Sequence, residues 1–150
     1  MHLVRTLMIV PLAVGPLVAL APNDVARTGF QEREKRAVVH LGSYPADLAA
    51  AGSAMLLAVN LQNNGADVTL FLDRDGVRLA DTRQPALEYA GIDVVGLLDT
   101  FVTGGGRVVL CPPGAAHAGI GRDHLRPGTE IGSPPVIAEL MLKADVVIDF

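Results

Sequence analysis

Short apolar runs rich in β-branched residues alternate with helix-forming stretches along most of this chain. Four such runs are expected to be strands, at residues 36–42, 66–73, 107–111 and 144–150. Apolar residues at helical spacing predict helices between them, at residues 46–64, 94–102 and from 134 onward. Strands that alternate with helices form a parallel sheet, because each connection has to cross one face of the sheet to reach the next strand. The chain is therefore predicted to be an α/β domain.

The composition agrees with this fold class. Half of the residues are hydrophobic but only 4% are aromatic, so the core has to be built mainly from Ala, Val, Leu and Ile. The buried stripe expected for the first helix consists of Leu48, Met55, Val59 and Gln62. The stripe expected for the last helix, which has Ser133 as N-cap and Pro134 in its first turn, consists of Val136, Ile137, Leu140 and Met141. A polar turn is expected at residues 74–76, followed by a surface excursion with some helix at residues 77–93.

The first 21 residues have the pattern of a secretory signal peptide. Arg5 supplies a positive start, residues 7–18 are apolar, and small residues follow. The apolar part is shorter than the roughly 20 residues of a membrane-spanning helix and is interrupted by prolines, so no stable membrane span is expected. We predict a signal peptide at 1–21, a polar linker at 22–35, a single domain at 36–150, and a periplasmic or secreted location. The alternatives are an uncleaved apolar arm and a misplaced start codon.

The charge of the chain argues against a nucleic-acid partner. Its formal net charge is −4, and no cluster of Lys and Arg produces a local basic field. Phosphate-binding patterns of the GxxxxGK and GxGxxG types do not occur, and the glycine triplet at residues 104–106 precedes a strand instead of following one. We therefore expect no nucleic-acid partner and no cofactor.

The single cysteine, Cys111, stands where the apolar run of residues 107–111 ends. In an open parallel sheet, ligands bind beyond the carboxyl ends of the strands, so this position is typical of an active site. Pro112 and Pro113 are tolerated in a first helical turn, and they predict a short helix with Cys111 as its N-cap. The positive end of that helix is expected to lower the pKa of the thiol and to favour the reactive thiolate.

Three cationic candidates follow the cysteine: His117, Arg122 and His124. Each of these residues also has an ordinary alternative, since a lone cysteine is often a packing residue and loop histidines are commonly solvated. We expect no metal, because the spacings of six residues from Cys111 to His117 and seven from His117 to His124 match no common zinc pattern. A CxxC oxidoreductase is excluded because Gly114 occupies the position of the second cysteine.

Three stretches together resemble the DsrE/DsrF-like family of sulfur-relay and sulfur-oxidation proteins. They are AAAGSAMLLAVNLQNNGADVTLFLDRDGVRLA, GGRVVLCPPGAAHAGI and LRPGTEIGSPPVIAELMLKADVVIDF. The resemblance implies a three-layer, flavodoxin-like α/β domain with a mainly parallel four- to five-stranded sheet, and association into trimers or hexamers. It also implies that a cysteine after the third strand, with a glycine eight residues later as in Cys111 and Gly119, accepts sulfur and carries it as a persulfide.

The leading hypothesis is an exported sulfur carrier or sulfurtransferase that exchanges sulfur with a donor or acceptor protein. Its expected site has Cys111 and His117 as catalytic residues and Gly114, Gly119 and Arg122 as substrate-binding residues. A second hypothesis is a non-catalytic oligomeric binding module in which Cys111 is a packing residue. A third is a redox-sensing thiol that dimerises through Cys111. The pKa of the thiol separates the first two, because a depressed pKa favours sulfur chemistry and an ordinary or raised pKa favours the module.

Overall fold

The computed structural model describes residues 34–150. The expected signal peptide at 1–21, and the expected linker up to residue 33, lie outside the described residues. Within the described part, no helix combines the length and the apolar character that crossing a membrane requires.

A parallel five-stranded sheet forms the centre of the domain, in the strand order β6-β5-β2-β1-β7. The strands are β1 (Arg36–Leu41), β2 (Asp67–Leu72), β5 (Arg107–Leu110), β6 (Thr129–Ile131) and β7 (Val146–Asp149). Four of the five coincide with the expected runs. The short edge strand β6 was not among them, because its sequence TEI has no apolar run and its pairing with β5 alone makes it a strand.

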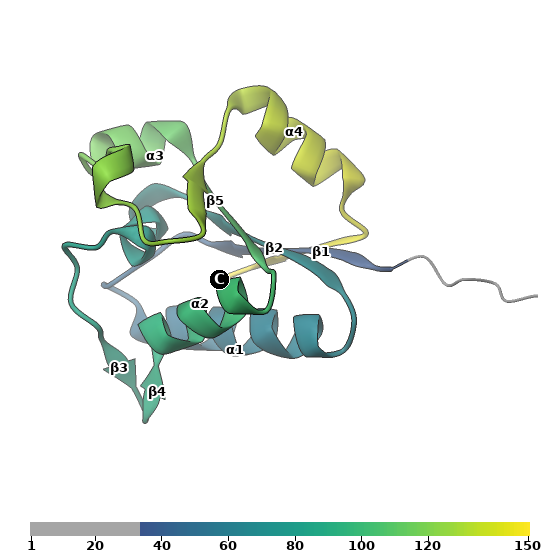
Figure 1. Cartoon of the computed structure of the whole chain (residues 1–150), viewed down its shortest axis with the longest axis horizontal. Coiled ribbons are helices and arrows are strands. Elements are labelled where there is room, and N and C mark those ends of the chain that lie inside the picture. Colours follow the sequence, from purple (N-terminus) through teal and green to yellow (C-terminus); the bar gives the residue numbers. More distant parts are fainter. Residues whose placement is uncertain (1–33) are drawn as a thin grey trace, which may run out of the picture. The chain divides into compact units, whose positions relative to one another are not determined.

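Helices cover both faces of this sheet, which confirms the layered α/β prediction (Figure 1). One face carries α1 (Leu48–Asn63) and α2 (Val94–Thr103), and α4 (Pro134–Lys143) lies on the other. The short helix α3 (Pro112–His117) begins where β5 ends. The remaining elements are the 3-10 helices η1 (Arg74–Ala80) and η2 (Arg122–His124) and a small hairpin of β3 (Glu88–Tyr89) and β4 (Ile92–Asp93).

The main core lies between the sheet and the α1–α2 layer. In α1 it is built mostly from small side chains, because alanine and glycine let the helix approach the sheet closely. The buried residues of α1 are Ala51, Gly52, Ala54, Met55 and Ala58. Of the expected stripe, Met55 is fully buried, whereas Leu48, Val59 and Gln62 are half-buried at the margin of this core.

The α4 layer is less completely buried than expected. Ile137, Leu140 and Met141 pack on a small cluster of sheet residues, but no residue of α4 is fully buried. The neighbouring strand β7 is an edge strand, so nothing in the described chain covers it on its outer side. Leu142 is 87% exposed, and Val147, on the α4 face of β7, is 44% exposed. The predicted stripe of α4 is therefore only partly buried, contrary to the prediction. The surface formed by α4 and β7 keeps exposed apolar side chains. Ser133 is the N-cap residue, but its side chain makes no capping hydrogen bond.

The connection after β2 is more ordered than the expected polar turn and surface excursion. Arg74 to Gly76 begin the 3-10 helix η1, whose Gly76 and Val77 are buried. Asp73 caps η1, since its carboxylate accepts a hydrogen bond from the backbone N–H of Arg74 at 2.6 Å. This helix therefore returns the chain across the carboxyl end of the sheet and packs against α3.

Candidate functional site

The carboxyl ends of β1, β2 and β5 place Cys111 beside Asp73. The paired register runs through Leu41, Leu72 and Leu110, and it continues for one residue through hydrogen bonds from Asp73 N to Leu41 O at 3.1 Å and from Cys111 N to Leu72 O at 2.8 Å. Side chains alternate between the faces of a sheet, so Asp73 and Cys111 both lie on the α4 face. The expected location of Cys111 at this edge is confirmed.

Cys111 is the N-cap residue of α3, as expected from the two prolines that follow it. Its carbonyl accepts the hydrogen bond of Ala115 N at 2.9 Å, but its side chain makes no capping hydrogen bond. A Cβ on Gly114 would lie 3.1 Å from Val77 Cγ1 and 3.2 Å from the Arg74 carbonyl oxygen. Glycine at position 114 therefore lets α3 approach η1 closely, which brings both elements to the thiol.

The Cys111 thiol is half-buried, and its pKa lies above the ordinary cysteine value. Burial makes the largest contribution, because it disfavours the charged thiolate. The Gly114 N–H acts in the opposite direction, whereas a hydrogen bond to Asp73 and the negative charge of that carboxylate raise the pKa further. The expected lowering of the thiol pKa was therefore wrong. The N-terminus of α3 does lower the thiol pKa, as expected, through the Gly114 N–H. Burial and the Asp73 carboxylate together raise the pKa by more.

A histidine that the sequence interpretation missed lies behind Asp73. His40 is on β1, on the same face of the sheet, and its ring stacks on Phe71 with 5.3 Å between ring centroids. Its Nδ1 is hydrogen-bonded to the carboxylate of Asp149 on β7, and its Nε2 lies 4.0 Å from Asp73 Oδ2. The alternation of side chains within the run RAVVHL, which puts Val38 and His40 on one face, is the signal that could have identified it.

Arg74 is a second residue that the sequence interpretation did not assign to the site. A Cβ on Gly42 would lie 1.9 Å from Arg74 Nη2, so the guanidinium occupies the space beside this glycine at the end of β1. Arg74 has a positive φ of 47°, which is uncommon for a residue other than glycine. Its side chain is exposed and forms no ion pair within residues 34–150. Arg74 therefore supplies a cation at the same edge as Cys111.

The expected cations after the cysteine are not brought to the thiol. His117 is exposed in the last turn of α3, about 9 Å along the helix axis from Cys111. Arg122 is exposed in η2, and His124 forms the end of that helix. No interaction of any of the three with Cys111 occurs in the described part of the chain.

Gly119 ends α3 and has a structural role. Its φ of 64° is left-handed, its N–H donates to Ala116 O at 3.1 Å, and Ile120 N donates to Ala115 O at 2.8 Å. This pair of hydrogen bonds is the Schellman arrangement of a helix C-terminus, which glycine adopts most readily. The position of a glycine eight residues after the cysteine is thus explained by helix termination.

Gly119→Ala is expected to lower the free energy of unfolding by about 1 kcal/mol and to leave the reactivity of the thiol unchanged. The cost comes from the positive φ, because a Cβ at this position would meet no atom within 4 Å. Urea unfolding and the rate of thiol alkylation measure the two quantities. An altered alkylation rate at unchanged stability would instead place Gly119 in the site.

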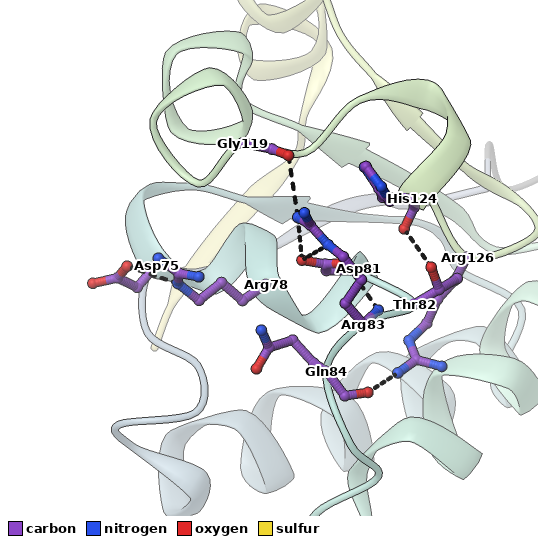
Figure 2. A network of polar contacts seen from close by, with 9 residues as sticks. All are labelled: Asp75, Arg78, Asp81, Thr82, Arg83, Gln84, Gly119, His124 and Arg126. Carbon is purple, nitrogen blue, oxygen red and sulfur yellow. Dashed lines mark hydrogen bonds and ion pairs between the residues drawn. The ribbon is translucent and has the colours of Figure 1, made fainter.

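A polar network fastens the segment after α3 to the segment after η1 (Figure 2). The Arg83 guanidinium donates to both carboxylate oxygens of the buried Asp81, at 2.9 Å and 2.8 Å, and also to the carbonyl of Gly119 at 3.1 Å. Thr82 N donates to the carbonyl of His124 at 2.8 Å. These contacts hold the far end of α3 in place and thereby support the position of its first turn.

A cavity lies at the opposite end of the sheet, under α4. Its volume is about 370 Å³, and its lining includes Arg36, Arg107 and Lys143. Each of these cations already pairs with a carboxylate: Asp67, Glu130 and Glu139, respectively. The cavity therefore offers no unpaired charge to a ligand, and it lies apart from Cys111. Within residues 34–150, no three His, Cys, Asp or Glu side chains are grouped as metal ligands.

Comparison with known proteins places this architecture in a family. Residues 36–150 match the DsrE/DsrF-like family. The crystal structure of the YchN protein from E. coli is similar, with 26% identity and a TM-score of 0.67 over 78% of this chain and 99% of that chain. The structure of MTH1491, a protein of unknown function from Methanobacterium thermoautotrophicum, shares the fold at 18% identity and a TM-score of 0.57, over 78% of this chain and 100% of that chain. No curated protein matches the sequence. Because the family match covers the whole described sheet and its helices, the chain belongs to the DsrE/DsrF-like family.

Proposed function

We propose that this protein is a sulfur carrier in which Cys111 accepts sulfane sulfur as a persulfide and passes it to a partner. The observation that supports this most directly is the position of the only cysteine, half-exposed at the carboxyl end of β5 and at the N-cap of α3, where the Gly114 N–H favours the thiolate. A backbone N–H stabilises a sulfur anion without carrying a charge of its own. Membership of a family of the sulfur-relay type supports the same function.

The chemistry of one thiol limits how the sulfur leaves again. The chain has a single cysteine, so a persulfide on Cys111 cannot be released by an internal disulfide. The terminal sulfur has to be taken by a thiol of another molecule. The proposed activity is therefore the transfer of sulfur from a donor to an acceptor, with a persulfide on Cys111 as the intermediate.

Intact-mass analysis after exposure to inorganic polysulfide tests this function. We expect an adduct of about 32 Da, the mass of one sulfur atom, which dithiothreitol removes. In Cys111→Ser the adduct is expected to be lost completely, because no other thiol exists in the chain. An unmodified mass for the wild-type protein, at polysulfide concentrations that load a free thiol, would contradict the proposal.

The raised thiol pKa favours a second candidate, a binding module of the same fold with a packing cysteine. In that protein the Cys111 thiol alkylates slowly and acquires no sulfur. The alkylation rate as a function of pH, measured beside the mass experiment, separates the two functions. Sulfur loading despite a raised pKa supports the carrier, and slow alkylation without sulfur loading supports the module.

We further propose a homo-oligomer, a trimer or hexamer, formed through the exposed apolar side chains of α4 and β7. Its support is the exposure of Leu142, Val146 and Val147 next to an unpaired strand edge. The particle mass in solution measures it, and a monomer at micromolar concentration would contradict it. An exported location is part of the same proposal and rests on the leader pattern of residues 1–21.

A further inference from the structure

Four titratable side chains gather on the α4 face at the carboxyl end of the sheet. Asp149 lies on β7 and His40 on the neighbouring strand β1, whereas Asp73 and Cys111 are the residues directly after β2 and β5. Asp73 stands between the thiol of Cys111 and the imidazole of His40. It is therefore placed to exchange a proton with either neighbour.

The orientation of His40 leaves one nitrogen without a partner. Nδ1 is engaged with Asp149, and stacking on Phe71 fixes the plane of the ring. Nε2 is buried and has no hydrogen-bond partner in the described chain, although Asp73 Oδ2 is only 4.0 Å away. A buried nitrogen without a partner destabilises a fold, so its presence at this end of the sheet calls for an explanation.

The tautomer of His40 supplies that explanation. When Nδ1 carries the hydrogen donated to Asp149, Nε2 of the neutral ring presents a lone pair and can only accept. An ionised Asp73 has no hydrogen to donate, whereas a protonated Asp73 has one. A proton placed between Asp73 and His40 Nε2 therefore completes a hydrogen bond that the two groups cannot make without it, and catalytic hydrogen bonds are often long before substrate binds.

We propose that Asp73 is the acid–base residue of this site and that His40, oriented by Asp149, is a positioning residue that stabilises the protonated form of Asp73. This inference rests on the proposed function of Cys111. Asp73 accepts the Cys111 proton as the sulfur attacks, and it returns that proton to the leaving group of the sulfur donor. Its side chain is about one third exposed, so a bound donor can reach it.

The step balances without an added oxidant or reductant. Cys111 Sγ attacks the outer sulfur of a donor R–S–SH, the S–S bond of the donor breaks, and its electron pair leaves on the inner sulfur. The Cys111 proton moves to Asp73 and then to that inner sulfur. The products are Cys111–S–SH and R–SH, so one S–S bond has formed and one has broken.

Two rates measured on Asp73→Asn test the assignment, with cysteine persulfide as the sulfur donor. Removing the carboxylate removes a charge and a hydrogen bond that raise the thiol pKa, so alkylation by iodoacetamide at neutral pH is expected to become faster. Sulfur loading is expected to become slower, by about 100-fold, because the proton has no path to the leaving group. If Asp73 acted only through its charge, Asp73→Asn would accelerate both alkylation and sulfur loading.

Variants of His40 test the positioning role. His40→Phe keeps a ring against Phe71 but lacks the acceptor, and it is expected to slow loading about 10-fold with little change in the pH profile of alkylation. His40→Gln restores an acceptor oxygen and is expected to recover part of the loss. Asp75→Asn, at an exposed position that does not contact the thiol, serves as the matched control and leaves both rates unchanged.

The outcomes separate this inference from the proposed function. A wild-type protein that acquires no sulfur from cysteine persulfide overturns both. A wild-type protein that loads, together with an Asp73→Asn variant that loads equally fast or faster, overturns only the role of Asp73. Equal loading by wild type and His40→Phe overturns the role of His40.

Discussion

Gly76→Ala is expected to destabilise the domain by about 3 kcal/mol, the upper part of the range for overpacking a buried site. A Cβ at this position would lie 2.1 Å from the carbonyl oxygen of Leu41 and 2.9 Å from its carbon. These are backbone atoms at the end of the interior strand β1, so no side chain can rotate away. Relief of the clash requires η1 to move off the end of the sheet, and urea unfolding at neutral pH measures the cost.

The same movement is expected to reach the site, because η1 begins directly after Asp73 and packs on α3. Gly121→Ala is the matched control. Its added Cβ would meet nothing within 4 Å, and its φ of −97° suits any residue, so stability should change by less than about 0.5 kcal/mol. A similar loss of stability in both variants would show that contact with Leu41 is not the cause.

Acid is expected to remove the stabilisation contributed by Asp81. This carboxylate is 1% exposed, and the Arg83 hydrogen bonds hold its pKa below the ordinary value against the opposing effect of burial. A group whose pKa is lower in the folded state stabilises the fold above its unfolded pKa of about 3.9, and that contribution is lost as pH falls through the folded-state value. The free energy of unfolding should therefore decrease below about pH 4.

Asp81→Asn isolates this contribution. At neutral pH the variant is expected to be less stable by about 2 kcal/mol, because hydrogen bonds to a charged group are lost, and its difference from wild type should shrink as pH falls below about 4. Asp75→Asn, which removes the exposed partner of Arg78, should cost less than about 1 kcal/mol. Urea unfolding across this pH range measures both variants. A difference between wild type and Asp81→Asn that is the same at both ends of the range would contradict the explanation.

Local patterns were sufficient for most of the fold. The strands β1, β2, β5 and β7 and the helices α1, α2 and α4 follow runs whose periodicity and end signals act within a few residues. The short helix after Cys111 was predictable for the same reason, since two prolines favour a first turn. The strand β6 and the ordered helix η1 were missed, because both depend on what they pack against.

The location of Cys111 at the end of a strand followed from the sequence, but the chemistry around it did not. His40 and Asp73 are separated by 33 residues and Asp73 and Cys111 by 38, as their numbers in the sequence show. Only the register of β1, β2 and β5 brings them together. His117, which is close in sequence, is carried to the far end of α3 by the rise of that helix.

The sequence by itself determined that this chain forms a parallel α/β domain with its one thiol at the carboxyl end of the sheet. Secondary-structure propensity and helix capping are sufficient for this, because they act over short distances along the backbone. The sign of the thiol pKa shift and the identity of its proton-exchanging neighbours were decided by tertiary structure. Charge and desolvation act through space, and here the carboxylate beside the sulfur arrives on a neighbouring strand.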